Sequence, residues 1–219
     1  MQILKDKLAN KSLTDNLDRD IPSFVCLCSG AGSNMLSILN SIKNQELNAN
    51  PLAIISNVST AKALTTAKQW EIETFILPNE NSSLRDETLT ELLQKLNPDF
   101  IILAGYLKKI PLEVIKKYHH KILNIHPSLL PKHGGKGMYG INVHKSVISH
   151  NEKLSGATVH LVTENYDEGP VILQEEIPVD ENDTAESLAK KVLQVEHQLF
   201  PKAIKEYLKS EYYSLPRNS

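Results

Sequence analysis

The sequence predicts an α/β fold: a mostly parallel sheet flanked by helices, with an antiparallel addition near the C-terminus. Short apolar runs alternate with stretches of helical periodicity between residues 23 and 125, and this alternation is typical of a parallel sheet. The run Phe100–Leu103 is wholly apolar, as expected of a strand buried on both faces of such a sheet. After residue 150, two longer extended runs follow each other with no helix between them, which indicates antiparallel pairing at the sheet edge.

The first part of the chain predicts five strands separated by four helices. Strands are assigned to short β-rich runs between turn residues, and helices to stretches where apolar residues recur every three or four positions. The strands are expected at Ser23–Cys28, Leu52–Ile55, Glu73–Leu77, Phe100–Leu103 and Lys121–Ile125. The helices between them are expected at Met35–Ile42, Thr60–Trp70, Leu84–Leu96 and Leu112–Tyr118.

The second part of the chain predicts a different arrangement. A long loop at Pro127–Gly140 leads to a short helix at Val143–Ser149. The two extended runs, Gly156–Val162 and Val171–Val179, are joined by a turn at Asp167–Pro170. A final helix is expected at Thr184–Leu208, with Thr184 as its N-cap and Ser187 completing an imperfect capping box.

Length and charge limit the possible classes of protein. The chain has 219 residues, enough for one large domain with its own core. Residues 1–20 are polar and lack sustained periodicity, so we expect an N-terminal extension at 1–20 and a single domain at 21–219. Lys and Arg number 24 and Asp and Glu 26, giving a net charge of −2, which argues against nucleic-acid binding through bulk charge.

Cysteine content and hydropathy give the expected compartment. The chain has two cysteines, Cys26 and Cys28, too few for a disulfide framework or a cysteine-based zinc site. We do not expect them to form a disulfide with each other, and we expect the protein to reside in a reducing compartment. No apolar stretch approaches the ~18 residues of a membrane span, and the N-terminus lacks the apolar region of a signal peptide. The sequence therefore predicts a cytoplasmic protein without membrane contact.

Glycines cluster in two loops, and the first loop predicts an anion site. Gly30 and Gly32 lie in Ser29–Asn34, between a strand and a helix, where free backbone N–H groups favour phosphate. Met35 replaces the third glycine of the dinucleotide fingerprint, and no acidic residue ends the second strand. A single phosphate of a mononucleotide-like ligand therefore fits better than NAD, and a tight turn without a ligand is the alternative.

Polar residues end the fifth predicted strand. Asn124 and His126 flank the apolar Ile125, so the period of a strand points both side chains to the same face. Open α/β sheets bind ligands at the carboxyl ends of their parallel strands. An amide beside an imidazole can stabilise an oxyanion. The alternative is two buried polar side chains that bond only to the backbone.

His160 and Asp167 form a second candidate pair. An aspartate near a histidine can raise its pKa or relay a proton, whereas the alternatives are a half-buried strand histidine and a turn aspartate. Arg85 lies at the start of a predicted amphipathic helix. It is either an exposed helix residue or a residue that binds an anion. Glu196 lies in the last helix, where a solvated face is the simpler interpretation. The other histidines lack the spacing of zinc ligands, so we expect no metal.

Four segments of the chain, taken in order, carry a family resemblance. They are Ser29-Gly30-Ala31-Gly32-Ser33-Asn34, Leu103-Ala104-Gly105-Tyr106, Asn124-Ile125-His126-Pro127-Ser128-Leu129-Leu130-Pro131, and Val159-His160 followed by Asp167-Glu168-Gly169-Pro170. The chain resembles the phosphoribosylglycinamide formyltransferases, the folate-dependent glycinamide ribonucleotide transformylases of purine biosynthesis. The third segment is specific to the formyltransferase superfamily, and the Gly-Ser-Asn loop points to this member. The resemblance covers roughly residues 22–208.

The resemblance implies a Rossmann-like formyltransferase fold with a seven-stranded sheet, and a set of site residues. Gly32, Ser33 and Asn34 are implied to bind the substrate phosphate, and Glu196 to contact the ribonucleotide. The catalytic residues are implied to be Asn124, His126 and Asp167, with His160 in support. The folate-binding residues are implied to be Arg85, Leu107, Lys108, Lys109, Ile110, Asn124, Thr163 and Asp167.

The implied reaction joins two small-molecule substrates and needs no metal. The formyl group of 10-formyltetrahydrofolate, a co-substrate, passes to the amine of glycinamide ribonucleotide. The enzyme is expected to be a monomer or a homodimer. Three features depart from the family pattern: Lys109 stands where an apolar residue is more common, Leu193 where many members carry glutamine, and the loop Lys132–Gly140 has no pattern to carry over.

Three other functions remain as alternatives. A 10-formyltetrahydrofolate hydrolase has a similar catalytic domain, but its relatives carry an additional N-terminal regulatory domain for which 20 polar residues are too few. A methionyl-tRNA formyltransferase would need a C-terminal RNA-binding domain and a basic surface. A non-catalytic mononucleotide-binding module would keep the first loop alone, and the presence of Asn124, His126 and Asp167 argues against it.

Overall fold

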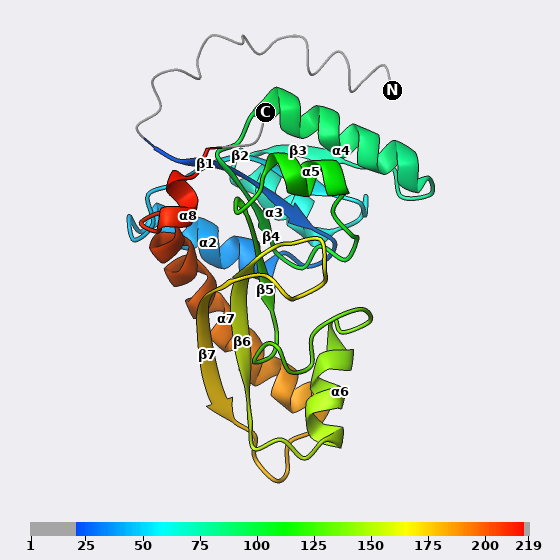
Figure 1. The fold of residues 1–219 in the computed structure, drawn as a ribbon, viewed down its shortest axis with the longest axis vertical. Coiled ribbons are helices and arrows are strands. Elements are labelled where there is room, and N and C mark those ends of the chain that lie inside the picture. Colours follow the sequence, from blue (N-terminus) through cyan, green and yellow to red (C-terminus); the bar gives the residue numbers. More distant parts are fainter. Residues whose placement is uncertain (1–20, 217–219) are drawn as a thin grey trace.

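A seven-stranded sheet forms the centre of the computed structural model, which describes residues 21–216 (Figure 1). The extension expected at residues 1–20 lies outside the described residues. The strands are β1 (Ser23–Cys28), β2 (Asn50–Ser56), β3 (Glu73–Ile76), β4 (Phe100–Leu103), β5 (Ile122–His126), β6 (Leu154–Leu161) and β7 (Val171–Pro178). The helices are α2 (Ser33–Lys43), α3 (Lys62–Gln69), α4 (Ser82–Leu96), α5 (Leu112–Lys117), α6 (Ile141–Ser149), α7 (Ala185–Tyr207) and α8 (Glu211–Ser214).

The order of the strands confirms the predicted fold class. They lie in the order β3-β2-β1-β4-β5-β6-β7. The first five strands pair in parallel, β6 pairs antiparallel with β5, and β7 pairs antiparallel with β6. The register between β5 and β6 places Asn124 opposite His160. Two residues that are 36 positions apart in the chain are thereby fixed side by side in the sheet.

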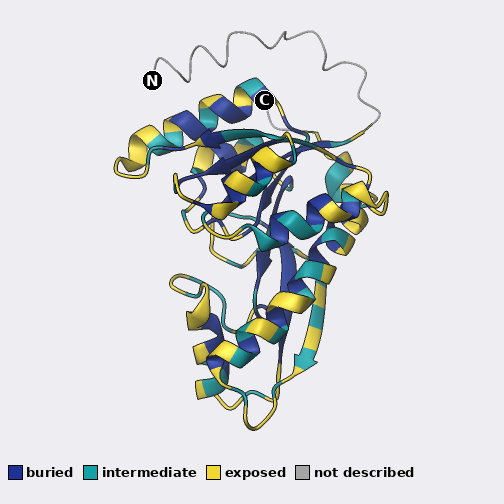
Figure 2. Cartoon of the chain, turned by 180° about the vertical axis from the view of Figure 1, so that it is seen from behind, coloured by how far each residue is buried: buried dark blue, intermediate teal, exposed yellow. Residues whose placement is uncertain are grey.

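Strand periodicity divides the buried side chains between two faces of the sheet. In β1, Phe24 and Cys26 belong to one hydrophobic core, and Val25 and Leu27 belong to the other. Helices α2, α3, α6 and α7 contribute apolar residues to the first core, and α4 and α5 contribute to the second. Figure 1 shows α7 running alongside β6 and β7, and Figure 2 shows the buried central strands and the more exposed edge strand β7. This is the layered arrangement that the alternating sequence predicts.

The ends of the elements depend on local caps. β1 and β4 have the predicted bounds. Helix α7 begins after Thr184, whose hydroxyl accepts from the Ser187 N–H while the Ser187 hydroxyl accepts from the Thr184 N–H. This completes the capping box, since both backbone donors are satisfied. The sequence did not predict α8, because a four-residue helix is too short to show periodicity.

Cys26 and Cys28 are free, fully buried thiols. Their sulfur atoms lie 3.7 Å apart, because residues two apart on a strand share a face of the sheet. No helix within residues 21–216 is both long enough and apolar enough to cross a membrane.

Candidate active site

The loops that follow β1, β4 and β5 leave the sheet at the same edge, because these three neighbouring strands are parallel. Ser29 joins the first two loops. Its N–H donates to the Gly105 carbonyl at 3.0 Å, and its hydroxyl oxygen accepts from the Leu107 N–H at 3.0 Å. The Ser29 hydroxyl also donates to Asn57 Oδ1 at 2.6 Å. The first glycine loop and the segment after β4 therefore form one connected surface.

Four of the predicted site residues meet at the end of β5. Asn124 Nδ2 lies 3.1 Å from His160 Nε2. Asp167 lies between the two histidines, with Oδ2 3.5 Å from His126 Nδ1 and Oδ1 3.6 Å from His160 Nε2. The Gly135 N–H donates to Asp167 Oδ2 at 2.8 Å and holds the carboxylate in place. The side chains of His126, His160 and Asp167 are 4%, 2% and 11% exposed, so their charges interact with little screening by water.

The hydrogen bonds of the two histidines define where their protons lie. His160 Nδ1 is 3.0 Å from the Leu161 carbonyl, which only accepts, so this nitrogen carries the proton. His160 Nε2 is then free to accept from the Asn124 amide. His126 Nε2 is 2.9 Å from the His133 carbonyl and must likewise be an N–H. Both nitrogens of His126 therefore face acceptors, a carbonyl and a carboxylate, and this arrangement favours the imidazolium form.

Burial and charge act in opposite directions on this group. Burial holds the pKa of His126 below its ordinary value, and the Asp167 charge and the His133 carbonyl offset only part of this lowering. For Asp167, burial raises the pKa, but the histidines and the Gly135 N–H outweigh it and hold the pKa below its usual value. Asp167 is therefore an anion at neutral pH. Any proton on His126 Nδ1 has a carboxylate partner.

The start of α2 provides free backbone donors. Gly32 precedes the helix with φ +75°, and no side chain caps the first turn. A Cβ atom on Gly32 would lie 2.7 Å from the Ala63 Cβ, so the close approach of α3 also requires glycine here. Uncapped N–H groups together with the helix dipole form a site for one anionic group.

Asn34 connects this helix start to α7. Its Nδ2 donates to Glu196 Oε2, and both residues are 8% exposed. Burial raises the pKa of Glu196 to about 6, although the Asn34 hydrogen bond lowers it. The solvated position favoured by the helical pattern is wrong for Glu196. The reason is that Glu196 lies on the apolar face of α7, with Val192, Leu199 and Phe200 one turn away, and this face packs along α2.

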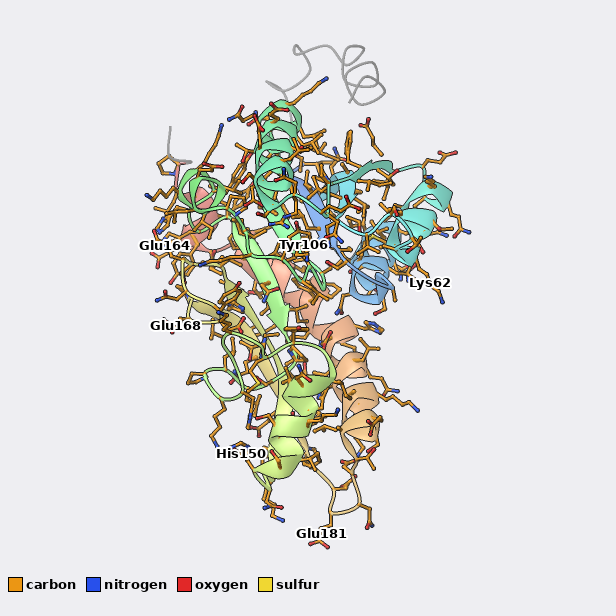
Figure 3. All side chains as sticks on the ribbon, turned by 90° about the vertical axis from the view of Figure 1, so that its right-hand side faces the viewer. Lys62, Tyr106, His150, Glu164, Glu168 and Glu181 are labelled. Atoms are coloured by element: carbon orange, nitrogen blue, oxygen red, sulfur yellow. The ribbon has the colours of Figure 1, made fainter. Side chains whose placement is uncertain are left out.

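Of the residues expected to bind folate, Leu107–Ile110 directly follow Tyr106 in the segment after β4, whereas Arg85 lies in α4. Arg85 is paired with Asp86 through Nη2 at 3.0 Å, and its side chain is only 11% exposed. Tyr106 is buried near these charges, and burial raises its pKa to about 12. Figure 3 shows Tyr106 near the middle of the molecule, between Lys62 on one side and Glu164 on the other.

Comparison with known proteins identifies the family. Residues 23–204 match the family model described as Formyl transferase. The phosphoribosylglycinamide formyltransferase of Haemophilus influenzae is 35% identical over 182 residues, which cover 82% of this chain and 84% of that protein. The chain belongs to the formyl transferase family. The resemblance seen in the sequence is confirmed at this level.

Other formyltransferases agree in sequence and in structure. The crystal structure of the phosphoribosylglycinamide formyltransferase from Brucella melitensis has a TM-score of 0.79 and 35% identity, covering 87% of this chain and 97% of that chain. The chloroplastic phosphoribosylglycinamide formyltransferase of Vigna unguiculata is 42% identical over 179 residues, or 80% of this chain. The matched region spans 57% of the length of that plant protein.

The structure of this formyltransferase chain brings together most of the predicted site residues in two groups. One contains Asn124, His126, His160 and Asp167, and the other contains Gly32, Ser33, Asn34 and Glu196. A third set belongs to two loops, the one that follows Tyr106 and the one that carries Asp167. Its members are Leu107, Lys108, Lys109, Ile110 and Thr163. Lys109 places its ammonium group 5.4 Å from the centre of the Tyr166 ring. The unusual lysine thus joins the loop after β4 to the loop that carries Asp167.

Two contacts at the site were missed by sequence reasoning. The Gly135 N–H bonds to Asp167, and the His133 carbonyl bonds to His126. Both come from the backbone of the second glycine-rich loop. The only signal in the sequence was the clustering of glycines there. Among residues 21–216, no group of three or more His, Cys, Asp and Glu side chains is arranged to hold a metal ion.

Proposed function

We propose that this chain transfers the formyl group from 10-formyltetrahydrofolate to the amine of glycinamide ribonucleotide, a step of purine biosynthesis. The observation that carries the proposal is the buried group of Asn124, His126, His160 and Asp167 at the carboxyl edge of the sheet. The relatives named phosphoribosylglycinamide formyltransferase carry the same activity in their name. The uncapped start of α2 and the neighbouring Glu196 suit the phosphate and ribose of the acceptor.

The first chemical step forms a carbon–nitrogen bond. The lone pair of the amine attacks the formyl carbon, and the electrons of the C=O double bond move to oxygen. The resulting oxyanion is stabilised by an N–H of Asn124 and by the nearby positive charge of His126 in its protonated form. Asp167 stabilises the charge on His126 Nδ1.

The second step breaks the bond between the formyl carbon and the folate nitrogen. The attacking amine becomes positively charged as it bonds, and its proton passes to Asp167, directly or through a water molecule. The oxyanion then collapses to a carbonyl, and the folate nitrogen leaves with the proton that Asp167 returns. The products are formylglycinamide ribonucleotide and tetrahydrofolate. All atoms and charges are accounted for without a metal.

Loss of 10-formyltetrahydrofolate, followed by absorbance with and without glycinamide ribonucleotide, tests the proposal. We expect loss only when the ribonucleotide is present. Loss without it would show that water is the acceptor and would establish the hydrolase alternative. No loss in either case would overturn the catalytic assignment and leave a binding module.

Replacing Glu196 with glutamine is expected to increase stability and to weaken ribonucleotide binding. Burial raises the pKa of Glu196 to about 6, so ionising this group costs free energy in the folded protein. The difference from the ordinary carboxyl pKa corresponds to about 2 kcal/mol. Glutamine keeps the hydrogen bond to Asn34 without the charge. The KM for the ribonucleotide should increase about tenfold, as for one lost hydrogen bond to a charged group.

The pH dependence of unfolding checks this prediction. A buried acid with a raised pKa destabilises the folded state only where it is ionised, so the variant should gain stability at pH 8 and lose that gain below about pH 4.5. Chemical denaturation at both pH values measures it. Glu206→Gln, at an exposed position of the same helix paired with Lys209, is the matched control and should change stability by less than about 0.5 kcal/mol. An E196Q protein without a pH-dependent gain would contradict the prediction.

A further inference from the structure

His126, the cationic residue of the proposed mechanism, contacts the backbone of the loop that follows β5. His126 Nε2 lies 2.9 Å from the carbonyl oxygen of His133, in the loop that follows β5. His133 has a left-handed backbone with φ +55°, a conformation that costs energy for a residue with a side chain. Something must therefore hold His133 in this conformation, and its own side chain provides the contacts.

The ring of His133 is anchored on helix α6 and the turn after it. Nδ1 lies within hydrogen-bonding distance of the Ser146 hydroxyl at 2.9 Å, and Nε2 lies 3.4 Å from Glu152 Oε1 without forming a hydrogen bond. Glu152 is held from the other side by Lys132, at 3.0 Å. The His133 side chain is only 9% exposed. A nearly buried ring with contacts at both nitrogens has little freedom, so the carbonyl of the same residue is fixed as well.

We propose that His133 is a positioning residue for His126: its anchored ring holds its own carbonyl oxygen against His126 Nε2 and so keeps a proton on that nitrogen. This inference rests on the proposed function, in which His126 acts as a cationic donor. It assigns a role to the loop Lys132–Gly140, whose sequence offered none. His133 acts through His126 and is not expected to contact either substrate.

The charges around His126 determine the direction of the effect. Asp167 faces it from the loop between β6 and β7, His160 from β6, His144 from α6 and His133 from its own loop. Burial lowers the pKa of His144 to about 4, so His144 is neutral at the pH of the reaction. The Asp167 carboxylate and the His133 carbonyl are the groups among these that favour the protonated form. Loosening the carbonyl should therefore lower the pKa of His126.

The pH profile of kcat/KM in two variants tests the inference. Ser146→Ala removes one anchor and leaves the ring of His133 in place. His133→Asn keeps a residue that tolerates the left-handed conformation but is too short to reach both anchors. We expect the alkaline limb to move to lower pH by roughly half a unit in S146A and up to one unit in H133N. Lys145→Gln, at the exposed position next to Ser146 in α6, is the matched control and should leave the limb unchanged.

A purely structural role would lower the rate equally at every pH, and that result in S146A would overturn the inference. A shift to higher pH in H133N alone would also overturn it, because His133 would then act through its charge. Nitrogen-15 NMR of the histidines, assigned with a His126→Gln variant, should show a protonated Nε2 in the wild type and a smaller protonated fraction in S146A. If the wild type consumes 10-formyltetrahydrofolate no faster with glycinamide ribonucleotide than without it, the proposed function fails. If H126Q is inactive while S146A keeps the wild-type profile, only this inference fails.

Discussion

The His126→Gln variant is expected to lose on the order of 10²–10³ in kcat, the typical effect of removing one oxyanion donor from an acyl-transfer site. Glutamine can still donate to the His133 carbonyl, so the loop keeps a partner at that position. It cannot carry a positive charge, and it cannot form an ion pair with Asp167. Because His126 is 3% exposed and ends a central strand, a substitution that keeps size and hydrogen bonding is needed to separate chemistry from folding.

Steady-state kinetics with both substrates, together with thermal unfolding, check this prediction. The KM for the ribonucleotide should change little, because its proposed contacts are at α2 and Glu196. His119→Gln, at an exposed position before β5, controls for loss of a histidine as such. An H126Q protein with more than about a third of the wild-type kcat would show that no charged donor is needed.

Asn124→Ala should have a loss of similar size, since it removes the other proposed donor. The two side chains lie on the same strand, two residues apart, and the proposal directs both to one oxygen atom. Residues that act as a unit are not additive, so the double variant should be only slightly slower than either single variant. Multiplicative losses in the double variant would place the two residues at different steps.

Much of this fold follows from periodicity and strand composition. β1 and β4 were predicted with correct bounds because they are short runs of apolar residues between clear turn signals. Asn124 and His126 were predicted to share a face because side chains two apart on a strand point the same way, and both lie at the end of β5 as predicted. The pairing of Asn124 with His160 depends on register between β5 and β6. Register is a tertiary property: the family resemblance placed both residues in one site but did not predict their pairing.

The features that could not be predicted depend on backbone conformation and on packing between distant elements. His133 and Gly135 act through a carbonyl and an N–H, and side-chain patterns contain no information on where these groups point. Glu196 was assigned to a solvated face because charged residues on a long helix usually lie there, although Val192, Leu199 and Phe200 one turn away are apolar. The contact of α7 with α2 buries it instead. Sequence reasoning therefore predicted the residue types of the site better than their environments.

The second large effect is expected from Asp167→Asn, which should lower kcat about 10²-fold at neutral pH. Asp167 has φ +58°, a conformation that asparagine adopts more readily than alanine, so the turn should keep its shape. The Asn side chain can still accept from the Gly135 N–H. What it loses is the negative charge that faces His126 at 3.5 Å and His160 at 3.6 Å.

The sign of the pH dependence follows from these charges. Burial raises the pKa of Asp167, but its partners lower it below the usual value, so the carboxylate is present throughout the neutral range. Its charge raises the pKa of His126 against the effect of burial. Without it the pKa of His126 falls further, and a larger share of His126 is neutral at pH 7. The loss in D167N should therefore be smaller at pH 5.5 than at pH 8.

Kinetics of D167N between pH 5.5 and pH 8.5 measure this change, with Glu168→Gln as the matched control. Glu168 is the neighbouring carboxylate, it is exposed, and it bonds to Asn165 rather than to either histidine. E168Q should keep the wild-type rate and profile. A D167N loss that is constant across the range would mean that Asp167 acts only as the proton acceptor for the amine. No loss at all would remove Asp167 from the mechanism, and the paired geometry of the two histidines would need another explanation.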